Sequence, residues 1–177
     1  LRERPFGKVA NPAHTPNSLF ITAMDTNPLA PSIVKILEGS EADFKNGLVI
    51  LSKLTRGKVY LCKSPGSDIP TADIPQLSVE EFAGLHPAGL AGTHIHFLDP
   101  VFRGKVVWHI DAQDVAAVGQ LFTSGKYPVQ RIISIGGPGI KKPRLIKTRV
   151  GASLDDILQG ELTDGDLRVI SGSVLSG

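Results

Sequence analysis

The chain has 177 residues, of which 41% are hydrophobic and 20% charged, and its formal net charge is +2. This length suits one domain or somewhat more, and no apolar run is long enough to span a membrane as a helix. So small a net charge does not indicate nucleic-acid binding, which needs a concentrated basic surface. Cys62, the only cysteine, excludes an internal disulfide and an iron–sulfur cluster with four cysteine ligands. We expect a soluble, intracellular segment of a longer subunit.

Strands and helices alternate in the first part of the chain. Short apolar or β-branched runs predict strands, and hydrophobic residues at helical spacing predict helices. The predicted strands cover residues 18–24, 58–62 and 105–110, and the predicted helices cover residues 31–37 and 41–54. This alternation favours right-handed βαβ units and a mainly parallel sheet with helices on both faces. The fold class that follows is α/β.

The most clearly marked helix follows the third strand. Asp111 is a suitable N-cap, and Gly125 is a suitable end. Between them, Val115, Val118 and Phe122 form the stripe that we expect to be buried.

The pattern changes after Pro128, which predicts one domain at residues 1–127 and a second at residues 128–177. Short strands are predicted at residues 131–135, 145–150 and 168–171. Ser153 and Asp156 form a capping-box pattern that predicts a short helix among these strands. The second domain is therefore expected to be a small, incomplete, β-grasp-like α+β unit.

Two motifs have an ordinary structural interpretation that we prefer. Glycines at residues 136–139 follow a strand, but Lys141 and Lys142 lead into another strand, so a hairpin is favoured over a phosphate-binding loop. Asp25 follows the first strand, where α/β folds place ligand-binding groups, although a turn carboxylate explains it more simply. No G-x-S-x-G motif occurs, so we predict no catalytic residue.

Histidines suggest further alternatives. If His94 and His96 alternate on a strand, they face one side, and His109 on another strand could join them in a zinc site with Asp99 nearby. We prefer a tightly folded loop at residues 86–96, whose glycines allow close packing. Its histidines could also hydrogen-bond a quinone carbonyl. We predict no metal site.

A basic run near the end of the chain could form a docking surface. As a strand, the run would show alternate positions on one face, where it could remain solvated, dock an acidic partner or approach lipid headgroups. Its residues are Lys141, Lys142, Arg144, Lys147 and Arg149.

Four segments, taken in order, resemble the NqrA subunit of the sodium-translocating NADH:quinone oxidoreductase. They are residues 22–31 (TAMDTNPLAP), 86–101 (HPAGLAGTHIHFLDPV), 136–156 (GGPGIKKPRLIKTRVGASLDD) and 168–177 (RVISGSVLSG). The resemblance covers essentially the whole chain. It implies a Rossmann-like first domain, similar to the flavin-binding domain of complex I, and a soluble-ligand-binding β-grasp (SLBB) second domain.

The resemblance also implies a function. The family couples electron transfer from NADH to ubiquinone to Na⁺ export, in a six-subunit complex on the cytoplasmic face of the bacterial inner membrane. Its NADH, flavins and iron–sulfur centre belong to partner subunits. This segment would be a peripheral, non-catalytic scaffold without a cofactor of its own; it would dock on the membrane subunit NqrB and could contact ubiquinone. The alternative is a freestanding flavin- or nucleotide-binding enzyme domain.

The residues expected to make contacts fall into two groups. The candidates for quinone or partner contact are His86, Gly89, Gly92, His94 and His96. The candidates for docking on a partner or the membrane surface are Lys141, Lys142 and Arg144.

Overall fold

The computed structural model describes residues 1–177, which form two compact units. Unit 1 comprises residues 1–26 and 32–128, and unit 2 comprises residues 27–31 and 129–177. The short segment 27–31 thus belongs with unit 2, although the sequence alone gives contiguous domains.

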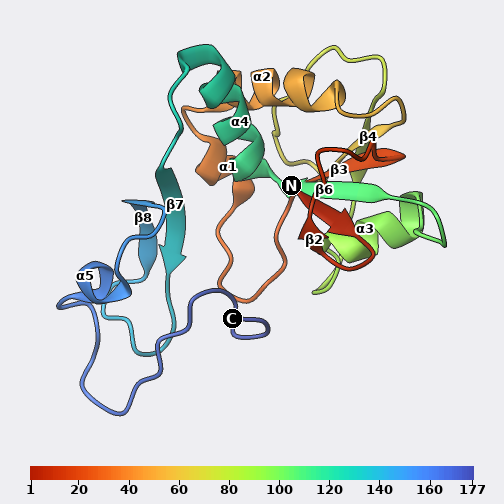
Figure 1. The fold of residues 1–177 in the computed structure, drawn as a ribbon. Coiled ribbons are helices and arrows are strands. Elements are labelled where there is room, and N and C mark those ends of the chain that lie inside the picture. Colours follow the sequence, from red (N-terminus) through yellow and green to blue (C-terminus); the bar gives the residue numbers. More distant parts are fainter. The chain divides into compact units, whose positions relative to one another are not determined.

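Unit 1 is built on a six-stranded sheet with the order β2-β1-β6-β3-β4-β5 (Figure 1). Four of its strands are parallel: β3 (Ser18–Ala23), β4 (Val59–Lys63), β5 (Leu77–Glu81) and β6 (Val107–Asp111). From the β5 edge, these four strands follow the order third, second, first, fourth along the chain, which is the order of the first four strands of a Rossmann fold. The predicted α/β class is confirmed.

Two short strands complete the sheet at the β6 edge. β1 (Arg2–Arg4) pairs antiparallel with β6, and β2 (Lys8–Val9) pairs antiparallel with β1. Neither strand was expected, because two or three residues are too few to show a strand period.

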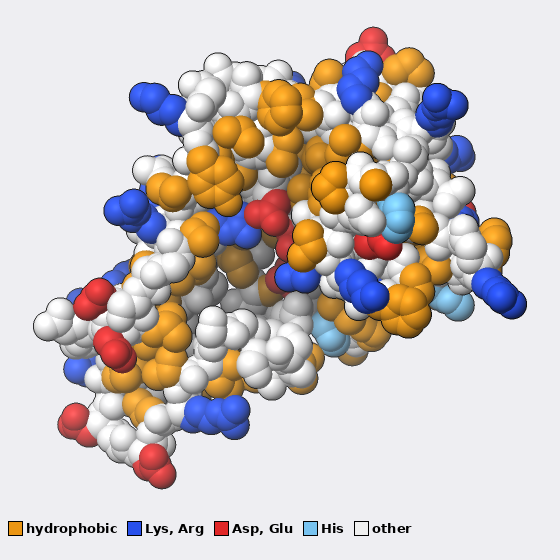
Figure 2. Space-filling view, in the orientation of Figure 1, with side chains coloured by type: hydrophobic (Ala, Val, Ile, Leu, Met, Phe, Trp, Pro, Cys, Tyr) orange, Lys and Arg blue, Asp and Glu red, His pale blue; other side chains and the backbone are white.

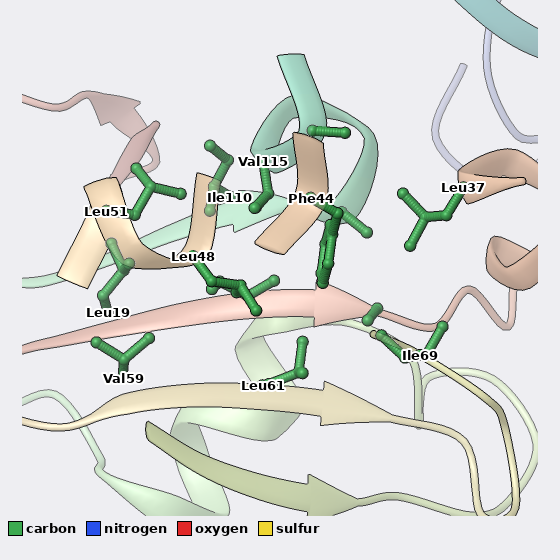
Figure 3. Close-up of a cluster of buried hydrophobic side chains, with 14 of the residues drawn as sticks. Leu19, Leu37, Phe44, Leu48, Leu51, Val59, Leu61, Ile69, Ile110 and Val115 are labelled. Atoms are coloured by element: carbon green, nitrogen blue, oxygen red, sulfur yellow. The ribbon is translucent and has the colours of Figure 1, made fainter. Parts of the chain in front are cut away.

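Helices cover both faces of this sheet. α1 (Ile33–Leu37), α2 (Glu41–Ser52) and α4 (Ala112–Ser124) pack on one face, and α3 (Ala91–Leu98) packs on the other. Successive side chains of β3 point to opposite faces of the sheet, so this strand contributes to the core on both faces. Leu19 and Ile21 join Phe44 and Val115 in the larger cluster, drawn in Figure 3. Phe20 points the other way, toward the α3 layer.

α2 and α4 lie so close together that glycine is required between them. A Cβ at Gly47 would lie 2.0 Å from the carbonyl oxygen of Val115, and a Cβ at Gly119 would lie 1.8 Å from that of Asp43. Both distances are far below van der Waals contact with backbone atoms, which cannot rotate away. The two helices therefore pack backbone against backbone.

Most of the predicted elements of unit 1 are confirmed, but Phe122 is not buried. α4 begins after Asp111 and ends at Gly125, whose φ of +67° is left-handed, as predicted. Its buried residues are Ala112, Val115, Ala116 and Gly119. Phe122 is 68% exposed, because the last turn of α4 extends beyond this stripe.

Unit 2 is a small hairpin with one helix. β7 (Gln130–Ile135) pairs antiparallel with β8 (Arg144–Arg149), so residues 136–143 form the predicted hairpin connection. α5 (Leu154–Leu158) follows, and the Ser153 hydroxyl accepts a hydrogen bond from the Asp156 amide, as predicted. The predicted strand at residues 168–171 is wrong, because these residues are exposed and pair with no strand.

No helix in either unit combines the length and apolar character needed to cross a membrane.

Candidate functional site

Residues 86–96 do not form the strand that a three-histidine metal site requires, nor a loop throughout. The segment makes turns up to Leu90 and then enters helix α3. Two residues along a helix correspond to a rotation of about 200°, so His94 and His96 point to different sides. His94 is fully buried and His96 is exposed. The idea that His94, His96 and His109 converge on zinc is therefore wrong, and no group of three His, Cys, Asp or Glu side chains is placed to hold a metal ion.

His94 has a structural role in the α3 layer. Its Nε2 lies 2.8 Å from the carbonyl oxygen of Ala88 and must donate, because a carbonyl oxygen only accepts. Its Nδ1 is then an acceptor, buried and without a hydrogen-bond partner. The Phe82 ring packs against the imidazole at 4.3 Å between centroids. Burial lowers the pKa of His94 and so favours the neutral ring.

The turn before α3 is hydrogen-bonded to Thr26, three residues after the end of β3. The amide of Gly89 donates to the Thr26 hydroxyl at 2.9 Å, and the same hydroxyl lies 3.3 Å from Nδ1 of His86. A Cβ at Gly89 would lie 2.7 Å from the Thr26 backbone nitrogen, so only glycine fits there without a shift. His86 and Gly89 thus serve an internal contact. Thr26 was missed, because a contact with a turn 60 residues away leaves no pattern in the sequence.

The carboxyl end of β3 does not resemble a dinucleotide cradle. That cradle needs a glycine-rich turn and a helix whose N-terminal amides face the phosphates. Residues 24–32 contain no glycine, and α1 has only 5 residues. At the start of α2 the Gly39 amide donates to the Glu41 carboxylate at 3.0 Å, which lowers the pKa of that carboxyl group. The start of α2 therefore already carries a negative charge, which opposes an added phosphate.

A shallow pocket of about 270 Å³ lies beside α3. α3 contributes Gly92, Ile95 and His96, and β1 with its following turn contributes Arg4 and Pro5. Of the five predicted contact residues, only Gly92 and His96 meet here. Arg4 was missed, because it is far from α3 in the sequence.

The basic run is partly used inside unit 2. Arg144 makes two hydrogen bonds to the Glu161 carboxylate, at 2.7 and 2.9 Å. This pairing raises the pKa of Arg144 and lowers the pKa of Glu161. Lys141 donates to the carbonyl oxygen of Gly160 at 3.2 Å. Both residues therefore hold the hairpin to the segment that follows α5.

The expectation that the basic run shares one face is wrong for Arg144. It pairs opposite Ile135, whereas Lys147 pairs opposite Ile132 and Arg149 opposite Gln130. Side chains alternate along a strand, so Arg144 lies on one face of the hairpin and the other two lie on the opposite face.

The fold and the site together define a class: a Rossmann-like scaffold without a dinucleotide cradle, followed by a small SLBB-type unit. Comparison with protein-family models gives the family. The model described as "NqrA second alpha/beta domain" matches residues 1–127, and the one described as "NQRA C-terminal domain" matches residues 132–177. The chain belongs to the NqrA family, and the resemblance seen in the sequence is confirmed.

Curated relatives agree along the whole chain. The Na(+)-translocating NADH-quinone reductase A-subunit of Marinomonas sp. is 58% identical over 99% of this chain. The proteins of the same name from Saccharophagus degradans and Pasteurella multocida are 52% and 54% identical over 100% of it. The matches cover 39%, 40% and 40% of these relatives, so the chain spans about two fifths of their length.

Proposed function

We propose that this chain is a scaffold segment of the NqrA subunit of a sodium-translocating NADH–quinone reductase, the complex that couples electron transfer from NADH to ubiquinone to Na⁺ export. The observation that carries the proposal is the identity of 52–58% to relatives of that name along essentially the entire chain. The segment works by holding other parts of the complex in place rather than by chemistry of its own. In this proposal it is peripheral, lies on the cytoplasmic face of the membrane and docks on the membrane subunit NqrB.

The segment binds no flavin in this proposal. Support comes from the glycine-free residues 24–32 and from the Glu41 carboxylate at the start of α2. NADH, flavins and the iron–sulfur centre then belong to partner subunits. The rival function, a freestanding flavin enzyme, is tested by titrating the purified full-length subunit with flavin mononucleotide. Stoichiometric binding would favour the rival; it is seen as absorbance at about 450 nm that stays with the protein after unbound flavin is removed.

The pocket beside α3 is a partner contact rather than a complete quinone site. Small-molecule sites usually enclose most of their ligand, in volumes of roughly 300–1,000 Å³. The pocket at Gly92 and His96 is smaller than this and open to solvent. Titrating the full-length subunit with a short-chain ubiquinone should leave the NMR signals of α3 unchanged. Shifts centred on His96 would instead make this pocket part of a quinone site.

The basic surface of unit 2 offers a test of docking. Lys142, Lys147 and Arg149 are exposed and have no ion-pair partner. Reversing these three to glutamate in the full-length subunit should weaken its assembly with the membrane subunits, because a surface that attracts acidic groups would then repel them. The measurement is the amount of NqrA that co-purifies with a tagged membrane subunit.

Arg144 must be kept in this experiment. A glutamate there would face Glu161 and disturb unit 2 itself, so a loss of assembly would say nothing about docking. The matched control reverses Lys45, Lys53 and Arg56, three exposed cations of unit 1 that form no ion pair. Equal assembly of the two triple variants would contradict a docking role for the basic surface.

A further inference from the structure

Arg4 is a cation without a counter-charge in this chain. Its guanidinium lines the pocket beside α3, and its Nε is buried without a hydrogen-bond partner. No carboxylate lies within ion-pair distance of it. A Cβ at Gly92 would lie 3.0 Å from Nη2, so the guanidinium packs directly against the Gly92 backbone. Partly buried charges of this kind are normally paired.

The neighbouring acidic residues cannot supply the missing charge. Glu3 lies on the other face of β1, where its carboxylate accepts from Trp108 and contacts His14. Asp99, at the end of α3, forms an ion pair with Lys105. His109 supplies no negative charge in either protonation state; burial, and then the positive charge of Arg4, lower its pKa to about 4 and keep the ring neutral.

Three exposed phenylalanines directly follow residues that line the pocket. Phe6, Phe97 and Phe102 are 81%, 71% and 68% exposed, and each follows a pocket-lining residue in the sequence. Lys8 lies over the Phe6 ring and Lys105 over the Phe102 ring, at 5.6 and 5.3 Å. Figure 2 shows hydrophobic side chains at the surface of unit 1 with cationic and histidine side chains among them. An arginine with exposed aromatic neighbours is the composition of a protein–protein contact centre.

We infer that Arg4, Gly92 and His96, with Phe6, Phe97 and Phe102 around them, form a docking surface for another protein subunit, whose aspartate or glutamate side chain binds Arg4 between apolar neighbours. A planar carboxylate matches the guanidinium fork, and desolvation by the phenylalanines strengthens that pair. A membrane surface is the less suitable occupant, because lipid headgroups meet exposed cations such as Lys8, whereas Arg4 is partly buried in a pocket that a side-chain carboxylate can enter.

This inference rests on the proposed function, since the partner is another subunit of the same complex. The test adds purified full-length NqrA to the complex prepared without it and measures the dissociation constant. Arg4→Gln and Phe97→Ser should each raise that constant about tenfold or more, the effect of losing a desolvated charge pair or an interface anchor. Gly92→Ala should weaken binding in the same direction by displacing the guanidinium, although every charge remains.

Matched variants serve as controls. Arg56→Gln removes an exposed arginine from another part of unit 1, and Phe122→Ser removes an equally exposed phenylalanine from α4; both should bind like wild type. Phe97→Ser is informative even if Arg4→Gln perturbs β1, because Phe97 packs on nothing buried.

Three outcomes would overturn the inference. Wild-type affinity in both Arg4→Gln and Phe97→Ser would exclude this surface while leaving the proposed function intact. Loss of binding to phosphatidylglycerol vesicles, with unchanged binding to the complex, would assign the surface to the membrane. If wild-type NqrA does not associate with the complex at all, the proposed function fails and the inference fails with it.

Discussion

The fold buries the imidazole rings of His94 and His109 in different surroundings. His94 lies between Phe82 and the carbonyl oxygen of Ala88 in the turn before α3. His109 is partly buried on the same face of the sheet, and burial, followed by the charge of Arg4, lowers its pKa to about 4. Both rings are neutral in the folded state near neutral pH, whereas both would gain a proton more easily in the unfolded chain.

Acid should therefore destabilise the protein through His109. Its pKa is lower folded than unfolded, so its full contribution to stability is present above about pH 6.5 and is lost as the pH falls toward 4. Between pH 7.5 and 4.5 the loss should be about 2–3 kcal/mol. Urea unfolding of wild type and His109→Gln at both pH values measures it, because the variant should lose less stability by about that amount. Equal losses would contradict the prediction.

Cys62 should be chemically silent until the protein unfolds. It is fully buried in β4, and burial raises the pKa of its thiol to about 12, so almost no thiolate is present near neutral pH. A thiol reagent should label native protein only at the rate of unfolding, and should label urea-unfolded protein at once. Ser134→Cys adds an exposed thiol and should react rapidly with one equivalent of reagent. Rapid labelling of native Cys62 would contradict its burial.

At the scale of elements, the contact between α2 and α4 is the tightest in unit 1. Gly119→Ala places a methyl group 1.8 Å from the carbonyl oxygen of Asp43. Alanine gains about 1 kcal/mol in intrinsic helix preference, yet separating two packed helices costs typically 1–3 kcal/mol or more. We expect net destabilisation, measured as a lower melting temperature. Gln120→Ala, at the exposed neighbouring position, should leave the melting temperature unchanged or raise it.

The sequence predicts best those elements whose buried residues follow a regular hydrophobic pattern. β3 and β4 are apolar runs, and α2 and α4 carry regular apolar stripes, so local periodicity suffices. β5 is a half-exposed edge strand with two glutamates, and α3 holds a glycine and two histidines, so tertiary packing overrides weak local preference.

Of the candidate site, the sequence predicts only the part formed by neighbouring residues. Glycines in residues 86–92 signal close packing, and the structure places backbone against Gly89 and a guanidinium against Gly92. Their partners, Thr26 and Arg4, come from the segment after β3 and from β1, and no single-sequence pattern joins residues so far apart. A strand period predicts His94 and His96 on one face, but the segment forms helix α3, in which the two side chains point to different sides.

At the scale of the whole molecule, the two units differ in how much core they have. Ile135 is the only buried hydrophobic residue of unit 2, and all others belong to unit 1. Leu154, Leu158, Leu162 and Val169 instead line an open hollow beside α5. Burial of apolar surface is the main favourable contribution to folding, so unit 1 should carry most of the stability.

Residues 1–128 should therefore fold alone, and residues 129–177 should not. The single tryptophan, Trp108, is buried in unit 1, and its fluorescence should report the same melting transition in the short and the complete chain. The isolated piece 129–177 should show no cooperative transition by circular dichroism. A cooperative melt of that piece, or a large loss of stability in residues 1–128, would contradict this division of the core.

The antiparallel pairing of β1 with β6 limits what this fold can become. In a complete doubly wound sheet, the strand equivalent to β6 is followed on its free side by two more parallel strands, which complete the second mononucleotide-binding half. Here β1 and β2 occupy that side. The sheet is closed to further parallel growth, and a dinucleotide would find only half of the platform on which its two nucleotides normally lie.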